Sequence, residues 1–217
     1  MEMNLSVPEM NADTALNYLK DGNTRFVNNF RMNRNLQREV EKTKEKQNPF
    51  AVIVSCMDSR TAPELIFDRG IGDIFSIRLA GNVVTPEVIG SVEYACAAVG
   101  SKAVLVLGHT GCGAIKGTLD DVRLGHIPTI TSRIKGCVGH DSSMEEVTVK
   151  NVVSGVKSLM EESEVLQNLL AKNEIKIIGT RHGEKQAETL LTREEYAQAE
   201  DMGDYYRVPA DSRDLNY

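Results

Sequence analysis

The sequence predicts an α/β fold in which helices flank a mainly parallel central β-sheet. Four short apolar runs rich in Val and Ile have the pattern of strands buried on both faces, at residues 50–55, 74–79, 103–107 and 175–178. Helical segments separate these runs, and strands that alternate with helices favour parallel pairing. Right-handed crossovers would then place the functional loops at the carboxyl ends of the strands.

Two stretches between these runs predict helices that cover the sheet. Residues 86–99 form an apolar stretch that Gly100 ends, as expected of a helix with a C-terminal glycine. Residues 147–170 have the apolar spacing of one or two amphipathic helices. The weaker pattern that follows predicts a polar loop, a helix and a short edge strand, at residues 179–184, 188–200 and 204–208.

The chain divides near Pro49 into an N-terminal helical arm, residues 1–48, and an α/β domain, residues 49–217. The arm begins with a helix that Asn11 or Asp13 would cap, and a second, highly charged helical segment follows. Because the arm has too little apolar surface to fold alone, we expect it to pack on the main body or on a partner subunit.

Composition excludes several classes of protein. The 217 residues include 41% hydrophobic and 26% charged residues, which is ordinary for a globular protein. The net charge of −6 and the lack of a basic stripe argue against nucleic acid or an anionic membrane as a partner. No apolar run approaches the roughly 18 residues of a membrane-spanning helix. Four cysteines are too few for a disulfide scaffold, so we expect a reducing, cytoplasmic location.

Two of the predicted strand ends carry side chains that bind metals. Cys56 directly follows the first strand, and His109 and Cys112 follow the third. If these parallel strands are neighbours, the three side chains meet at one edge of the sheet. Two thiolates and an imidazole suit Zn²⁺, and three protein ligands leave a fourth position for water, as in catalytic sites. The sequence therefore predicts a catalytic zinc.

Asp58 and Arg60 add an acceptor and a cation to the first strand end. Alternate side chains of an extended segment share a face, so both are expected on the side of Cys56. Zinc with two thiolates and a neutral imidazole carries no net charge, so it polarises water less than an all-imidazole site. Asp58 would accept a hydrogen bond from a water at the fourth position, and Arg60 would keep Asp58 ionised. An ordinary loop salt bridge is the alternative for this pair.

These motifs resemble those of the β-class carbonic anhydrases. The likeness is carried by the C-x-D-x-R segment that begins at Cys56 and the H-x-x-C-G segment that begins at His109, and it covers residues 47–116. It includes four further motifs: Pro63-Glu64, Gly72-Asp73-Ile74-Phe75 with Arg78, Ala80-Gly81-Asn82, and Ser91-Val92-Glu93-Tyr94. Each motif alone is weak, whereas their combination is specific.

The resemblance implies zinc-dependent, reversible hydration of carbon dioxide to bicarbonate and a proton. It implies one Zn²⁺ per chain on the three ligands above, with Asp58 and Arg60 as the acid-orienting pair. It also implies a substrate pocket lined by Gln47, Phe75 and Tyr94, as in plant-like members. In that family the pocket lies at a dimer interface, so Gln47 would act on the zinc of the neighbouring subunit in a homodimer or higher homo-oligomer.

Two features depart from the family. Ile53 stands three residues before Cys56, where a subgroup with an inhibitory bicarbonate pocket has Trp, so we expect that pocket to be absent or altered. The usual strand and hairpin after the last parallel strand are not recognisable in the atypical C-terminal tail, residues 179–217. Two alternatives therefore stay open: hydrolysis of carbonyl sulfide or carbon disulfide, and a non-catalytic zinc- or bicarbonate-binding homologue in which Asp58 takes the fourth zinc position.

Other residues have simpler interpretations. Phe75 and Tyr94 have the alternative of plain core packing, and Gln47 that of a solvated helix end. Cys96 lies in an apolar helix and is expected to be a buried hydrophobe. Cys137 and His140 form a C-x-x-H pair without a partner pair, which favours a surface loop over a second zinc site.

Overall fold

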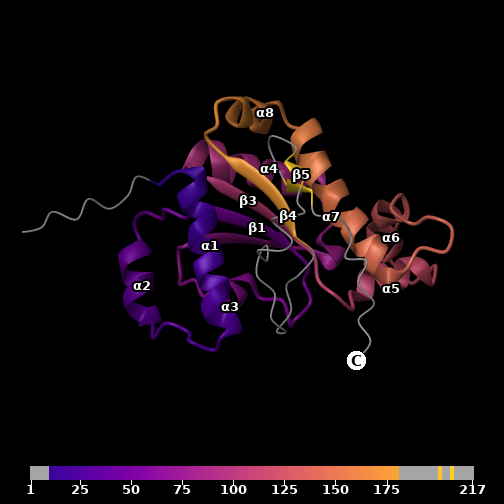
Figure 1. Ribbon diagram of the computed structural model, residues 1–217, viewed down its shortest axis with the longest axis horizontal. Coiled ribbons are helices and arrows are strands. Elements are labelled where there is room, and N and C mark those ends of the chain that lie inside the picture. Colours follow the sequence, from indigo (N-terminus) through magenta and orange to yellow (C-terminus); the bar gives the residue numbers. More distant parts are fainter. Residues whose placement is uncertain (1–9, 181–199, 202–205, 208–217) are drawn as a thin grey trace, which may run out of the picture.

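The centre of the protein is a four-stranded parallel sheet with the strand order β2-β1-β3-β4 (Figure 1). The computed structural model describes residues 10–180 and two short backbone stretches, 200–201 and 206–207. The sheet strands are β1 (Ala51–Ser55), β2 (Ile74–Arg78), β3 (Ala103–Leu107) and β4 (Lys176–Thr180). The predicted α/β fold with a parallel sheet is therefore confirmed, and each strand begins within one residue of its predicted start.

The strands pair with their carboxyl ends level. Ser55, the last residue of β1, is paired with Arg78 of β2 and with Leu107 of β3. Leu107 is in turn paired with Thr180 of β4. Because β1 and β3 are neighbours that end together, the two loops that carry the predicted metal ligands leave the sheet side by side.

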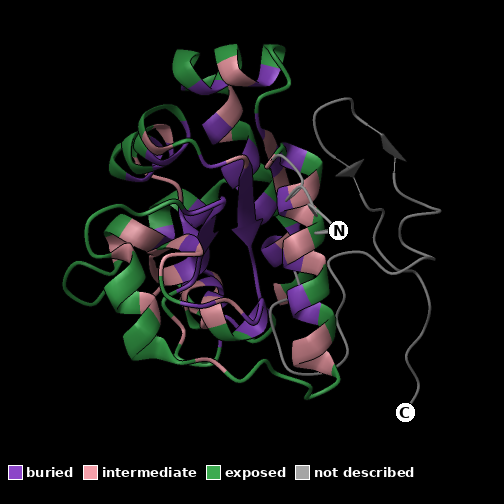
Figure 2. Cartoon of the chain, turned by 90° about the vertical axis from the view of Figure 1, so that its left-hand side faces the viewer, coloured by how far each residue is buried: buried purple, intermediate pink, exposed green. Residues whose placement is uncertain are grey.

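Helices cover both faces of the sheet (Figures 1 and 2). The helices on one face are α1 (Ala12–Val27) and α3 (Pro63–Ile66). Those on the other face are α4 (Pro86–Glu93), its π-helical continuation η2 (Tyr94–Val99), α7 (Met144–Glu161) and α8 (Glu164–Ala171). Every residue of β1 and β3 is buried between these layers, which explains why their sequences are continuously apolar rather than alternating.

Local signals set the helix ends. The Asn11 side chain caps α1 by accepting a hydrogen bond from the N–H of Thr14 at 2.9 Å. Ser143 and Glu146 form a reciprocal capping box at the start of α7. Gly100 ends the π-helical turn with φ at 100°, as the prediction of a C-terminal glycine requires.

Two short helices lie at the carboxyl end of the sheet, α5 (Gly113–Leu119) and α6 (Pro128–Lys135). Together with α7 they enclose a separate apolar cluster that includes Val83, Ile115, Ile134, Val147 and the buried side chains of Cys56 and Cys112. Sequence patterns predicted neither α6 nor the single turn of α3, because elements of one or two turns have too few residues to display a helical period.

The C-terminal part of the sheet differs from the prediction at Gly179. The polar loop was predicted over residues 179–184, but Gly179 and Thr180 still belong to β4, and residues 181–184 lie outside the described residues. A Cβ atom on Gly179 would lie 2.7 Å from Cγ1 of Val152, so glycine is needed there for α7 to pack closely.

Part of the C-terminal tail also lies within the described residues. Of the helix predicted over residues 188–200, only Glu200 is described, and it begins a strand instead. Strand β5 (Glu200–Asp201) pairs in antiparallel fashion with β6 (Tyr206–Arg207), which falls within the predicted strand at 204–208. This pair is a sheet of its own and not an edge of the central sheet.

The first helix of the N-terminal arm belongs to the core of its own chain. Ala15 and Leu19 of α1 have no exposed surface and pack against the sheet. Of the two surfaces that the sequence left open for this helix, the structure therefore uses the main body. Helix α2 (Leu36–Thr43) buries none of its side chains, and its packing on a partner subunit stays a prediction.

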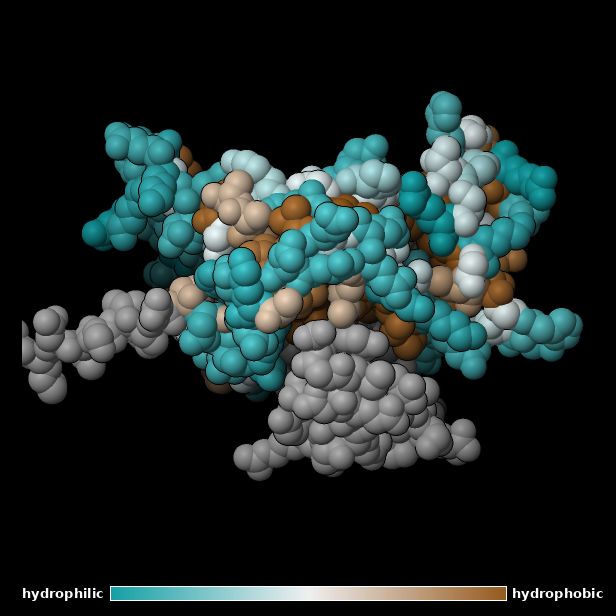
Figure 3. Space-filling view, turned by 90° about the horizontal axis from the view of Figure 1, so that it is seen from above, coloured by the Kyte–Doolittle hydropathy of each residue, from teal (hydrophilic) through white to brown (hydrophobic). Residues whose placement is uncertain are grey.

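The exterior of the described residues is largely polar. The face seen in Figure 3 is hydrophilic over most of its area, with smaller hydrophobic patches between the polar side chains. None of the described helices combines the length and the apolar composition that crossing a membrane requires.

Asp68 ties the segment between α1 and α2 to the body of the protein. Its buried carboxylate accepts hydrogen bonds from Arg25 Nε at 2.5 Å and from the N–H of Met32 at 3.3 Å. Arg34 Nη2 donates to the Asp68 carbonyl at 2.8 Å. Burial acts to raise the pKa of the Asp68 carboxyl, but these hydrogen bonds and the two positive charges outweigh it, so that the pKa lies below its ordinary value.

We predict that Asp68→Asn lowers the free energy of unfolding by about 2 kcal/mol at neutral pH. Breaking a fully buried pair costs about 3–5 kcal/mol, and the loss is smaller here because Arg25 keeps part of its solvent contact. Since the pKa of Asp68 is lowered in the folded state, the difference from wild type is complete above about pH 4 and disappears as the pH falls further. Urea unfolding at several pH values measures it.

Asp121→Asn is the matched control for this prediction. Asp121 also has a left-handed backbone, with φ at 50° against 44° for Asp68, but its ion pair with Arg123 is exposed. The control should leave the unfolding free energy close to that of wild type, because solvent screens an exposed ion pair. Equal losses in the two variants would contradict the role given to Asp68.

Candidate metal centre

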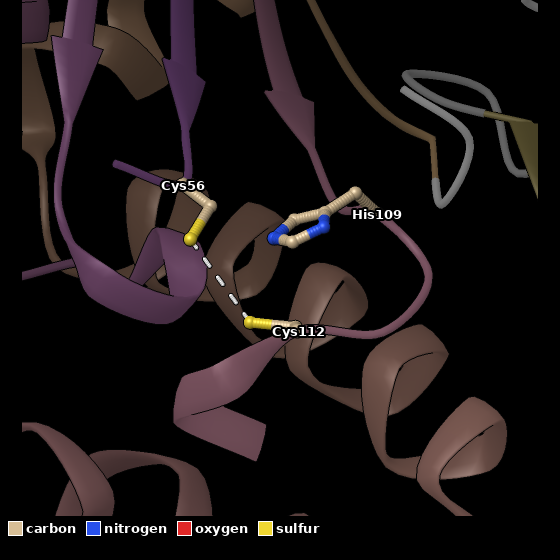
Figure 4. Close-up of side chains that lie close together, drawn as sticks. All are labelled: Cys56, His109 and Cys112. Carbon is tan, nitrogen blue, oxygen red and sulfur yellow. Dashed lines mark hydrogen bonds between the residues drawn. The ribbon is translucent and has the colours of Figure 1, made fainter. Parts of the chain in front are cut away.

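Cys56, His109 and Cys112 converge at the carboxyl edge of the sheet (Figure 4). Their ligand atoms all lie within 4.8 Å of one another, and the two sulfur atoms are 4.0 Å apart. All three side chains are buried, with at most 5% of their surface exposed. The convergence that the sequence predicted is therefore confirmed.

The fold positions each ligand by a different element. Cys56 directly follows β1, and His109 lies two residues beyond the end of β3. Cys112 occupies the residue before α5, and Gly111 makes the intervening turn with φ at 62°, a value that suits glycine. The close spacing of His109 and Cys112 thus depends on this turn.

The residues present fit a zinc ion. At a Zn–S distance of about 2.3 Å, two sulfurs of a tetrahedral site lie about 3.8 Å apart, close to the observed separation. The ring Nδ1 of His109 lies 2.9 Å from the Thr110 carbonyl, which only accepts, so Nδ1 carries the proton and Nε2 keeps its lone pair. Among the described residues the cluster has these three ligands only, which leaves one position of a tetrahedral ion open.

Hydrogen bonds make Cys56 a ready thiolate. The Cys112 thiol is the main cause that lowers the pKa of Cys56 to about 4, although burial opposes the shift. The backbone N–H groups of Asp58 and Gly81 lower the pKa further, because they donate to Sγ at 3.4 and 3.3 Å. The Cys56 thiolate in turn raises the pKa of Cys112, so the proton that the pair retains lies on Cys112.

Asp58 and Arg60 form a forked pair beside the cluster. Arg60 donates from Nε to Oδ1 of Asp58 at 3.0 Å and from Nη2 to Oδ2 at 2.9 Å. The backbone N–H of Arg60 adds a bond to Oδ1 at 2.9 Å. These bonds hold the pKa of Asp58 well below its usual range. The carboxylate is thus an ionised acceptor that is turned to Arg60 and is not part of the ligand cluster.

Arg78 fixes the backbone of the same loop from β2. Its Nε donates to the carbonyl of Cys56 at 3.1 Å, and its Nη2 donates to the carbonyl of Asp58 at 2.5 Å. The sequence motif included Arg78 but gave it no role. The backbone donors from Asp58 and Gly81 to the Cys56 sulfur were also missed, because backbone groups leave no signal in the residue types.

The residues of the predicted substrate pocket lie outside the ligand cluster. Phe75 and Tyr94 line one groove of about 360 Å³ between β2 and α4. Tyr94 is 57% exposed, so it is not a core aromatic, whereas Phe75 packs partly against the core. Gln47 is exposed in the segment after α2. Their contact with substrate stays a prediction.

The remaining cysteines have no place in the cluster. Cys96 is buried in the π-helix, and burial raises its pKa to about 12, as expected of an inert hydrophobe. Cys137 lies in the turn that follows α6, but its side chain is buried in the apolar cluster around α5, α6 and α7 and not at the surface as predicted. His140 is exposed and pairs with Asp141.

Comparison with known proteins identifies the family of this chain. A family model described as carbonic anhydrase matches residues 51–189. A carbonic anhydrase of Mycolicibacterium smegmatis is 35% identical over 188 residues, which cover 81% of this chain and 91% of that protein. The chain belongs to the carbonic anhydrase family. Members of the β class are zinc enzymes, and Cys56, His109 and Cys112 of this carbonic anhydrase lie close enough together to hold the ion.

Solved structures support the same fold. A β-carbonic anhydrase of Aspergillus fumigatus superimposes with a TM-score of 0.59 at 21% identity, over 77% of this chain and 83% of that one. A short part of the sequence is similar to a different enzyme, the UDP-glucose 4-epimerase of Rickettsia canadensis, with 57% identity over 56 residues. That match covers 25% of this carbonic anhydrase and 16% of the epimerase, too little to assign it an epimerase activity.

We predict that Cys56→Ser loses zinc while Cys96→Ser retains it. Substituting residues that merely support metal ligands lowers metal affinity by about 10–100-fold, so removing a thiolate ligand should cost more than about 100-fold. Cys96 is equally buried, at 5% exposure, and is therefore the matched control for any loss of folding. Competition with a chromophoric chelator measures the affinity. One zinc per chain in both variants would contradict the ligand assignment.

Proposed function

We propose that this carbonic anhydrase catalyses the reversible hydration of carbon dioxide to bicarbonate and a proton, with Cys56, His109 and Cys112 as its zinc ligands. The observation that carries the proposal is the buried three-ligand cluster with an ionised acceptor, Asp58, two residues after the ligand Cys56. Membership of the family supports the same reaction. Bound zinc would lower the pKa of a water to about 7 and so supply a nucleophile at neutral pH.

Asp58 would orient the reacting water. Its carboxylate is ionised and accepts three hydrogen bonds from Arg60, so it can take one more donor but cannot give a proton. A water O–H that donates to Asp58 would present its oxygen lone pair to the carbon of CO₂. The pairing of Asp58 with Arg60 also favours catalysis over the alternative in which Asp58 fills the fourth zinc position.

Two copies of the chain would complete the substrate pocket. The groove of Phe75 and Tyr94 lies along β2, which is an edge strand of the central sheet. An edge strand with exposed aromatic surface is a typical interface element. In such a homodimer the arm of one chain would carry Gln47 toward the pocket of the other.

None of the four cysteines forms a disulfide, which supports a reducing compartment such as the cytoplasm.

We predict that Asp58→Asn lowers kcat/KM for CO₂ hydration by about 100-fold or more while zinc stays bound, since an amide can donate and no longer dictates the orientation of a water. Asp120→Asn is the control, because its exposed ion pair with Lys116 on α5 lies outside the centre. Stopped-flow measurement of CO₂ hydration, with the zinc content quantified, tests both variants.

Normal turnover by Asp58→Asn would contradict the water-orienting role of Asp58. If wild-type protein released sulfide from carbonyl sulfide faster than it hydrated CO₂, the proposed substrate would be contradicted.

We predict that Gly90→Arg converts the dimer to a monomer. Gly90 lines the groove of Phe75 and Tyr94, and a Cβ built there meets no atom within 4 Å. A single chain therefore has room for the arginine side chain. A partner packed on β2 would meet the added charge. Gly136→Arg is the control, because its Cβ is equally free but it lies at the end of α6. Light scattering after gel filtration should give a dimer for the control and a monomer for Gly90→Arg.

A further inference from the structure

We propose that Asn151 is a positioning residue of the metal centre, which acts on Cys56 through the backbone of Gly81. Asn151 lies on α7, far from the ligands in sequence, and is 5% exposed. Its Nδ2 donates to the Gly81 carbonyl at 2.7 Å, and the Gly81 N–H donates to Cys56 Sγ at 3.3 Å. Both bonds are buried, so Asn151 is joined to a ligand sulfur through one residue.

Gly81 needs such an anchor because of its backbone. Its φ is 65°, and the next residue, Asn82, also has a positive φ, at 44°. A Cβ on Gly81 would lie 2.7 Å from Cδ1 of Ile134 and 3.0 Å from Cβ of Ala114, so only glycine fits. Glycine has the widest rotational freedom of any residue, because it has no side chain to restrict the direction of its N–H. The hydrogen bond from Asn151 to the Gly81 carbonyl holds this turn in the one conformation that faces the sulfur.

The consequence for the metal is electronic as well as geometric. An N–H that donates to a thiolate withdraws charge from the sulfur and reduces its donation to a bound cation. Two thiolates cancel the charge of Zn²⁺, so each such bond leaves the ion more electrophilic. Asn151 therefore orients the Cys56 sulfur and tunes it without touching the metal.

The inference rests on the zinc site proposed above but not on the substrate. Asn151→Leu removes the donor at nearly constant volume. Thr148→Val is its matched control: Thr148 is also buried on α7, but its hydroxyl donates to the Met144 carbonyl of the same helix at 2.8 Å. Two readouts separate positioning from simple stabilisation of the fold: zinc affinity by chelator competition, and the sulfur-to-metal charge-transfer band of the cobalt(II)-substituted protein.

We expect Asn151→Leu to lower zinc affinity by about 10–100-fold, because the Cys56 sulfur loses its fixed orientation. The cobalt band should also move, because the sulfur then donates more charge to the metal. Thr148→Val should leave both readouts unchanged. A folded Asn151→Leu protein with the affinity and spectrum of wild type would overturn the proposal. Wild type that binds no zinc would instead overturn the proposed function.

A second variant guards against failure to fold. Asn151→Ser removes the same donor, and its smaller side chain can bond to its own helix, so it is judged by the same two readouts. Wild-type protein loaded with cadmium-113 tests the remaining link by NMR. Scalar coupling between the metal and the Gly81 amide proton is expected through the N–H···S bond, and its absence would overturn the proposal.

Discussion

The level, parallel pairing of β1 with β3 is the constraint on which the metal centre depends. Cys56 and His109 follow the ends of these strands, and their loops meet only because Ser55 is paired with Leu107. A slip of one residue would move one loop by about 3.3 Å along the sheet and turn its side chains to the other face. That shift is close to the whole distance of 4.0 Å between the two sulfurs. The apolar layers on both faces hold the register. Packing of the core therefore also fixes the positions of the metal ligands.

The strands bring the loops together at the carboxyl edge of the sheet, and contacts within and between the loops then orient the side chains and backbone groups there. Arg78 holds the carbonyls of Cys56 and Asp58 from the neighbouring strand β2, and Arg60 fixes the Asp58 carboxylate in a fork. Gly81 brings a backbone donor to the Cys56 sulfur from the turn after β2. The contacts from Arg78 and Gly81 lie in buried or half-buried places, where a hydrogen bond is strong and a missing one is costly.

The sequence predicted the parts of the molecule whose signals are local. Buried strands and the Cys-His-Cys ligands are visible because residue types and short spacings define them. The supporting contacts are not, since the bond from Asn151 to Gly81 joins residues 70 positions apart. One signal was present: Asn151 stands four residues after Val147 and four before Gly155, a polar side chain on the buried face of an apolar helix. Gly179 was taken for a loop because its role, close packing of α7 on β4, is tertiary.

The single chain contains the candidate metal ligands and the Asp58–Arg60 pair, but it leaves large apolar side chains exposed to solvent. Carbon dioxide is apolar and reacts best where bulk water is excluded, because low polarity strengthens the interactions of Asp58 and of the ion. Yet Tyr94 is 57% exposed in a groove along an edge strand, and Met57, next to the ligand Cys56, is 64% exposed. Exposed apolar surface of this kind favours the proposed homodimer. A second copy packed on β2 would cover this surface in both chains, so the chemistry of the proposed substrate and the free sheet edge argue for the same assembly.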